Sequence, residues 1–362
     1  MLHSIRYTLL YIILITLVGC AVYELETQNT EPVIHDTGPV WPPPPQTARI
    51  QYIRSISGQS DIGMKNSWFK KTMETILGKD EAIEMLLRPY GVFADSERIY
   101  VTDPGNRLLH VFDMREKKYL KITKADEKEF ISPIGVAADK NGGIYVSDSL
   151  LKRVFLFNKE GKYLREIGSD NLFIRPAGIA IDGERLYVVD THGHKILVFS
   201  KKDGAFLFSF GKNGIHKGDF NYPTNIFIDK NGLLYITDSM NFRVQIFERG
   251  GSFISTFGRH GDGSGDFSKP KGIAVDSEGY IYVADAQFDT VQIFDKDGRL
   301  LLAFGNTGRG KGQLILPAGL FIDEQDRIYV ADSYNNRIQI FQYLKVKESR
   351  DQGVKDSSVE RS

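Results

Sequence analysis

The chain has 362 residues, of which 46 are Lys or Arg and 46 are Asp or Glu, so its formal net charge at pH 7 is zero. A nucleic-acid-binding domain usually carries an excess of basic residues, so this balance argues against a nucleic-acid partner. Cys20 is the only cysteine, which excludes a disulfide bond within one chain.

The first 19 residues have the features of an export signal. His3 and Arg6 precede an uncharged apolar run from Tyr7 to Val18, which is too short for a comfortable transmembrane helix. We therefore expect a signal peptide over residues 1–19 and export of the rest of the chain.

The apolar run ends in Leu-Val-Gly-Cys, which resembles the lipobox of bacterial lipoproteins. The resemblance implies that Cys20 is acylated and becomes the new N-terminus, and more than one acyl chain anchors a protein stably to a membrane. Ala21 follows the cysteine where Asp would signal retention, which by resemblance to Gram-negative sorting rules favours the outer membrane. An ordinary signal peptide with an incidental cysteine is the alternative.

Residues 20–46 are polar, mildly acidic and end in Trp-Pro-Pro-Pro-Pro-Gln. This composition predicts an unpacked, partly stiff tether that holds the next domain away from the bilayer. Without residues 1–19 the chain keeps 45 basic and 46 acidic residues, a formal charge near −1.

An isolated strand pattern over residues 48–58 comes next, followed by an insertion at residues 57–88 that has the periodicity of helices. One helix is predicted around Trp68 and Phe69, and a second short one after Asp80. We expect the insertion to border the face on which ligands bind. Either it only packs on the ring, or Trp68 and Phe69 remain partly exposed and dock a partner.

Six copies of one pattern fill the chain from residue 89 to residue 341. Each copy has a Gly-hydrophobic strand, a strand that ends in Asp and a strand that ends in Phe, and its period of about 45 residues is that of a propeller blade. A fourth strand follows every copy but the last. The strand at residues 48–58 matches the fourth-strand pattern, so it is predicted to complete blade six and close the ring. The leading prolines are Pro89, Pro133, Pro176, Pro223, Pro270 and Pro317.

Motifs such as Pro-Lys-Gly-Ile-Ala-Val-Asp, Ile-Tyr-Val-Ala-Asp and Asn-Asn-Arg-Ile-Gln-Ile-Phe resemble the NHL-repeat family over residues 48–343. The resemblance implies an all-β, six-bladed β-propeller at residues 47–343, closed by the N-terminal strand. The polar tail at residues 344–362 is predicted to be disordered. NHL propellers include lyases, RNA-binding modules and sensor domains, so the fold does not decide the function.

The aspartates that end the second strands resemble a ring of catalytic charges, and three of them have an arginine five residues later. A group needed once for chemistry has no reason to recur in every blade, so we expect these residues to accept hydrogen bonds from loops and to pair with arginine. They are Asp103, Asp148, Asp190, Asp238, Asp285 and Asp332, with Arg153, Arg243 and Arg337.

Histidines break the repeat in blades three to five. His192 and His194 replace the polar turn of blade three, and His216 and His260 lie in the next two connections between blades. Together they form a hypothetical site for a divalent metal ion. The alternative is that they are unconnected surface residues.

Two functions remain open. The first is a non-enzymatic, lipid-anchored module of the cell envelope that binds a ligand or another envelope protein on one propeller face. The second is a metal-dependent enzyme resembling the streptogramin lyases or peptide-amidating lyases. The sequence favours the binding module, because no acid/base pair or nucleophile accompanies the histidines.

Overall fold

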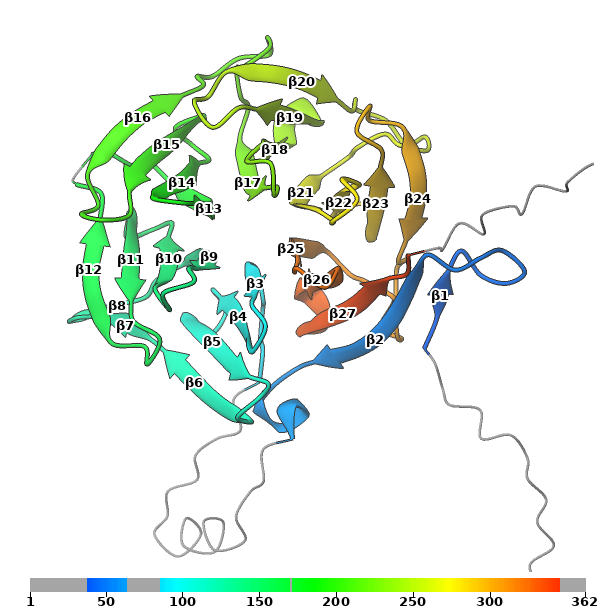
Figure 1. Ribbon diagram of the computed structural model, residues 1–362, viewed down its shortest axis with the longest axis horizontal. Coiled ribbons are helices and arrows are strands. Elements are labelled where there is room, and N and C mark those ends of the chain that lie inside the picture. The colour runs from blue at the N-terminus through cyan, green and yellow to red at the C-terminus, as the bar shows by residue number, and fades with distance from the viewer. Residues whose placement is uncertain (1–37, 64–84, 170, 346–362) are drawn as a thin grey trace, which may run out of the picture. The chain divides into compact units, whose positions relative to one another are not determined.

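Six β-sheets are arranged as blades around a central axis in the computed structural model, which describes residues 38–63, 85–169 and 171–345 (Figure 1). The predicted all-β, six-bladed propeller is therefore confirmed. In every blade the first strand lies nearest the axis and the strands follow each other outward as an antiparallel meander.

The strands of the first five blades have similar lengths and spacings. Blade one contains β3 (Val92–Ala94), β4 (Arg98–Asp103), β5 (Leu108–Asp113) and β6 (Lys118–Ile122); blade two contains β9 (Pro133–Ala138), β10 (Ile144–Asp148), β11 (Arg153–Phe157) and β12 (Tyr163–Ile167); blade three contains β13 (Pro176–Asp182), β14 (Arg185–Asp190), β15 (Lys195–Ser200) and β16 (Phe206–Phe210); blade four contains β17 (Pro223–Ile228), β18 (Leu234–Asp238), β19 (Arg243–Phe247) and β20 (Phe253–Phe257); blade five contains β21 (Pro270–Val275), β22 (Ile281–Asp285), β23 (Thr290–Phe294) and β24 (Leu300–Phe304).

Blade six is built from both ends of the described chain. Its inner strands are β25 (Pro317–Ile322), β26 (Arg327–Asp332) and β27 (Arg337–Tyr343), and β2 (Ile50–Ile56) pairs with β27 from Ile50 opposite Tyr343 to Ile56 opposite Ile338. The predicted closure by an N-terminal strand is confirmed.

A fifth strand, β1 (Val40–Trp41), pairs with the outer edge of β2. The prediction of an unpacked tether up to residue 46 is therefore wrong at its C-terminal end. The ring of Trp41 lies with its centroid 5.8 Å from the rings of both Phe304 and Phe341, so it packs over the joint between blades five and six. The adjacent prolines gave the segment the composition of a linker, so the sequence did not predict this packing.

The core consists of six apolar clusters, and each is built mainly from two neighbouring blades. The second and third strands are buried on both sides by adjacent blades, whereas an outer strand such as β24 alternates between partly buried and exposed residues. Close approach of inner strands explains the glycine in most first strands. A Cβ atom at Gly135 would overlap the carbonyl oxygen of Ala177 in blade three.

Most of the insertion lies outside the described residues, as do Trp68 and Phe69. Its described ends form a short 3₁₀ turn, η1 (Gln59–Ile62), and an isolated bridge between Gly58 and Met85. The second predicted helix does not extend to Leu86 and Leu87, which are not helical. Further small elements are the hairpin of β7 (Lys124–Ala125) and β8 (Lys128–Glu129) and the 3₁₀ turns η2 (Ser239–Asn241) and η3 (Ser333–Asn335).

Cys20, the signal segment, most of the tether and the tail from residue 346 also lie outside the described residues. Within the ranges that the structure does describe, no helix is long and apolar enough to cross a membrane.

The antiparallel meander gives the ring two different faces. The connection face carries the turns between second and third strands and the connections from each blade to the next. The cavity face carries the turns between first and second strands and between third and fourth strands.

Candidate functional site

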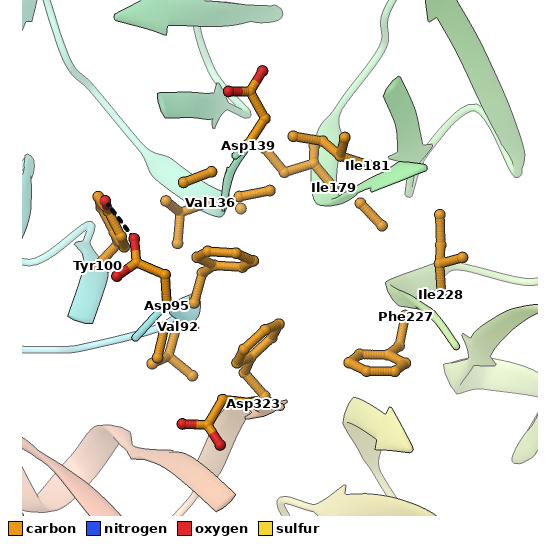
Figure 2. Close-up of a pocket in the computed structure, with 18 of the residues that line it drawn as sticks. Val92, Asp95, Tyr100, Val136, Asp139, Ile179, Ile181, Phe227, Ile228 and Asp323 are labelled. Atoms are coloured by element: carbon orange, nitrogen blue, oxygen red, sulfur yellow. Dashed lines mark hydrogen bonds between the residues drawn. The ribbon is translucent and has the colours of Figure 1, made fainter. Parts of the chain in front are cut away.

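A cavity of about 1270 Å³ occupies the centre of the ring (Figure 2). Its walls are the inner strands of blades one, two, three, four and six, and its rim consists of the turns that follow these strands on the cavity face. Apolar side chains form most of the wall, including Val92, Val136, Ile179, Ile181 and Ile228. Concave apolar walls with a polar rim are typical of ligand sites.

Three phenylalanines from different blades form an aromatic row across the channel. The ring centroid of Phe321 lies 4.5 Å from that of Phe93 and 6.0 Å from that of Phe227. The equivalent positions in the other three blades are alanines. Ala137 and Ala274 are buried, at 3% and 0% exposure, whereas Ala180 remains partly exposed. The open side of the row is therefore at blade three.

A second set of aspartates ends the first strand of each blade, and those of blades one, two, three and six line the rim of the cavity. Asp95 accepts hydrogen bonds from the amides of Glu97 and Arg98 and from the hydroxyl of Tyr100, at 2.7 to 3.0 Å. Figure 2 shows the hydrogen bond between Tyr100 and Asp95, and it shows the carboxylates of Asp139 and Asp323 turned away from the middle of the cavity. These carboxylates therefore hold the turns in place. The repeat already contained this signal, since all six first strands end in Asp or are followed directly by it.

One rim carboxylate is also paired with a cation from the next blade. Lys201 Nζ lies 3.1 Å from Asp139 Oδ2, and the two side chains are only 12% and 9% exposed. Burial by itself raises the pKa of Asp139, but the Gly143 amide and the Lys201 ammonium outweigh it and lower that pKa below its ordinary value. Burial, with the nearby Asp139 carboxylate, raises the pKa of Tyr145 to about 12.

The predicted aspartates at the ends of second strands lie on the connection face and are fully buried. Asp238 accepts hydrogen bonds from the Asn221 amide and from the side chains of Asn241, Arg243 and Gln245. Because Asn221 belongs to the connection from blade three, this carboxylate fastens that connection to blade four. The other five accept loop amides in the same way: Asp103, Asp148, Asp190, Asp285 and Asp332.

Two of the three expected arginine pairs are present. Arg243 Nε lies 2.8 Å from Asp238, and Arg337 Nε lies 2.8 Å from Asp332. Arg153 differs, because its Nε lies 3.6 Å from Glu166 on the neighbouring strand instead of pairing with Asp148. The shared spacing of five residues therefore did not determine the partner.

The four histidines lie on the connection face but do not gather into a metal site. The rings of His192 and His194 both contact Tyr222, with centroids 5.1 and 4.7 Å away, and the ring centroid of His260 lies 4.3 Å from that of Phe242, with the two rings tilted. His216 is exposed in the connection to blade four. Among the described residues, no group of three or more His, Cys, Asp or Glu side chains is arranged to hold a metal ion.

The rim of the cavity lies on a different face from the one on which the sequence predicted ligand binding. We expected ligands on the face of the interblade connections, whereas the rim of the cavity consists of turns on the opposite face. The inner strands carry different side chains at equivalent positions, and only their assembly around one axis brings Phe93, Phe227, Phe321 and Ala180 together.

Comparisons with known proteins agree with this architecture. A family model described as a 6-bladed beta-propeller matches residues 168–234 and 230–292, and an NHL repeat model matches residues 314–341. The chain is 25% identical over 187 residues to a probable peptidyl-alpha-hydroxyglycine alpha-amidating lyase of Caenorhabditis elegans, a match that covers 46% of this chain and 49% of that protein. The chain thus spans about half the length of this curated relative.

Two solved structures illustrate how widely the fold is shared. A streptogramin B lyase has a TM-score of 0.54 at 13% identity, covering 72% of this chain and 94% of that one. An auxiliary nutrient binding protein from Bacteroides thetaiotaomicron has a TM-score of 0.55 at 13% identity, covering 72% and 70%. At these identities the likeness shows the fold alone. The blade count, the ring closure and the repeat matches together identify the chain as a six-bladed β-propeller in which residues 314–341 match the NHL repeat.

Proposed function

We propose that this protein is a binding module of the cell envelope that holds a ligand, or a segment of another envelope protein, in the central cavity. The observation that carries the proposal is the combination of apolar walls with an aromatic row that is open at Ala180. The rim aspartates are already engaged by turn amides and tyrosine hydroxyls, so they shape the opening and leave the apolar interior as the recognition surface.

The lyase alternative rested on the histidines. These lie on the connection face, opposite the rim of the cavity, and His192, His194 and His260 contact aromatic rings of neighbouring loops. We therefore do not propose lyase activity.

Filling the cavity tests the binding proposal. Ala180→Phe places a bulky ring at the open side of the aromatic row, and Ala303→Phe makes the same change at an exposed position of the outer strand β24. Each variant and the wild type would be captured from gently solubilised, cross-linked envelopes, and the co-purifying proteins and small molecules identified. We expect a component that wild type and Ala303→Phe retain and Ala180→Phe loses. Equal retention by all three proteins, or capture of the propeller alone, would contradict the proposal.

We further propose that acylation of Cys20 attaches the module to the membrane, because a multiply acylated terminus binds bilayers durably. Cells grown with an alkyne-bearing fatty acid should incorporate the label into the wild-type protein. Cys20→Ser should abolish incorporation, and labelling that survives this substitution would refute the assignment of Cys20.

A further inference from the structure

The two faces of the ring differ in their exposed apolar side chains. Of the described residues, 16 large apolar side chains are exposed: six lie on strands at the outer edges of blades, and the other ten lie in loops. All ten of those loop residues are on the connection face. None of the described residues in the turns of the cavity face belongs to this group. Among the loops, the apolar exposure is thus confined to one face, and clustered exposure of this kind marks an interaction site.

Six of these ten loop residues form two sets at equivalent positions in different blades. Leu87, Ile131 and Ile174 each stand two residues before the leading proline of their blade. Leu150, Met240 and Tyr334 each stand two residues after the aspartate that ends the second strand, and they are 50%, 53% and 58% exposed. Equivalent positions of a closed propeller lie at the same height along its axis. The exposed apolar groups therefore lie close to one plane around the ring, which suits a flat partner better than a protein that contacts one side.

The two faces also differ in their exposed charged side chains, and the connection face has the larger excess of basic residues. The described loops of the connection face, with the β7–β8 hairpin, carry 12 exposed basic and five exposed acidic side chains. The turns of the cavity face, with Arg49 and Lys345 beside β2 and β27, carry 12 and eight. Lys152, Lys217 and Lys269 are among the bases of the connection face and lie in loops of three different blades. Anionic lipid headgroups attract basic groups near a membrane surface by about 1 kcal/mol each.

From this placement we propose that the connection face docks on the surface of an anionic lipid bilayer, with its apolar loop residues inserted among the headgroups and its lysines and arginines against the phosphates. A planar ring of single apolar side chains interspersed with cations is the chemistry of an interfacial membrane contact. The cavity face then points away from the bilayer and is open to a ligand. This inference concerns a different surface from the central cavity and does not depend on what the cavity binds.

A site-specific fluorophore tests the orientation directly. The full chain with Cys20→Ser would receive one new cysteine, either Met240→Cys on the connection face or Lys296→Cys in a turn of the cavity face, labelled with nitrobenzoxadiazole. Vesicles of phosphatidylethanolamine and phosphatidylglycerol, 3:1, should shift the emission of the label at position 240 to the blue and leave the label at position 296 unchanged. Because the reporter is local, any binding through the N-terminal apolar segment does not by itself produce this difference.

Matched triple substitutions test the side chains that carry the contact. Leu150→Ser, Met240→Ser and Tyr334→Ser together should lower the fraction that sediments with these vesicles about tenfold, since three insertions are lost. Leu164→Ser, Ile254→Ser and Leu301→Ser on the outer strands remove comparable exposed area, at 52%, 44% and 52% exposure, and should leave sedimentation unchanged. Replacing phosphatidylglycerol with phosphatidylcholine, or raising the salt concentration, should weaken binding of the wild type.

Two results would overturn the proposal. One is an unchanged emission at position 240 in the presence of the anionic vesicles. The other is an equal loss of sedimentation for the two triple variants. A shift at position 240 that requires a soluble envelope protein and not lipid would assign the connection face to a protein partner instead.

Discussion

Each blade carries one aspartate at the end of its second strand, on the connection face, and one at the end of its first strand, on the cavity face, but the two sets act over different distances. In blade four, Asp238 on the connection face is fully buried and contacts the connection from blade three as well as Arg243. Asp229 on the cavity face is partly exposed and accepts the amides of Asn231 and Leu233 in its own turn. The first residue fastens the connection between two blades, and the second shapes a local turn.

The largest expected effect on stability comes from replacing Asp238, and the same change at Asp229 serves as the comparison. Asp238→Ala should lower the free energy of unfolding by about 4 kcal/mol, because it leaves Arg243 and Gln245 buried without their partner. Asp229→Ala should cost about 1 kcal/mol, because the amides of an exposed turn regain water. Urea unfolding of both variants measures the difference. Equal losses would mean that the two faces contribute alike.

Lys201→Met addresses a contact on the cavity face through which a rim aspartate reaches the next blade, as Asp182 also does through Arg249. The substitution leaves Asp139 nearly buried without its cation, although the Asn141 and Gly143 amides remain bound to it. We expect a loss of about 2 to 3 kcal/mol at pH 7. Lys202→Met, at an exposed neighbouring position, is the control and should change stability by less than about 0.5 kcal/mol.

The same ion pair predicts a pH dependence. The pKa of Asp139 is lower in the folded state than in the unfolded chain, so its stabilising contribution is present above the unfolded pKa, about 4, and is lost as the pH falls through the folded pKa. Lys201→Met removes one cause of the lowering. The urea midpoint of this variant should therefore decline less steeply between pH 4 and pH 2.5 than that of the wild type, and parallel curves would contradict the assignment.

The smallest expected effect on folding belongs to the exposed apolar residues of the connection face. Leu150→Ser, Met240→Ser and Tyr334→Ser together should change the free energy of unfolding by less than about 1 kcal/mol, since each side chain is about half exposed. A thermal unfolding scan checks this expectation. A loss of several kcal/mol would show that these residues support the loops and are not simply exposed for contact.

The architecture was largely predictable because it rests on repetition. Six aligned prolines, aspartates and phenylalanines defined the blades, and the unpaired strand at residues 48–58 identified the closure that the β2–β27 pairing shows. The structural role of Asp238 and its equivalents was predictable for the same reason, because a residue that recurs in every blade is expected to stabilise the blade structure.

The site was not predictable to the same degree. The histidines of blades three to five drew attention because they break the repeat, yet the structure turns them toward the rings of Tyr222 and Phe242. The alternation of Phe and Ala in the first strands was visible in the sequence, but it becomes informative only when Phe93, Phe227 and Phe321 meet at the axis. Trp41 was missed because its neighbours are prolines and its contacts, Phe304 and Phe341, lie about 260 residues or more away in the chain.

The sequence by itself determined the number of blades, their strand order and the residues that hold each turn, because these depend on local alternation and on patterns repeated along the chain. Tertiary structure decided which unrepeated side chains meet. Closure of the ring brings first strands from five blades around one cavity, and the antiparallel meander sends the exposed apolar loop residues to the opposite face, since each turn alternates between the two ends of a blade.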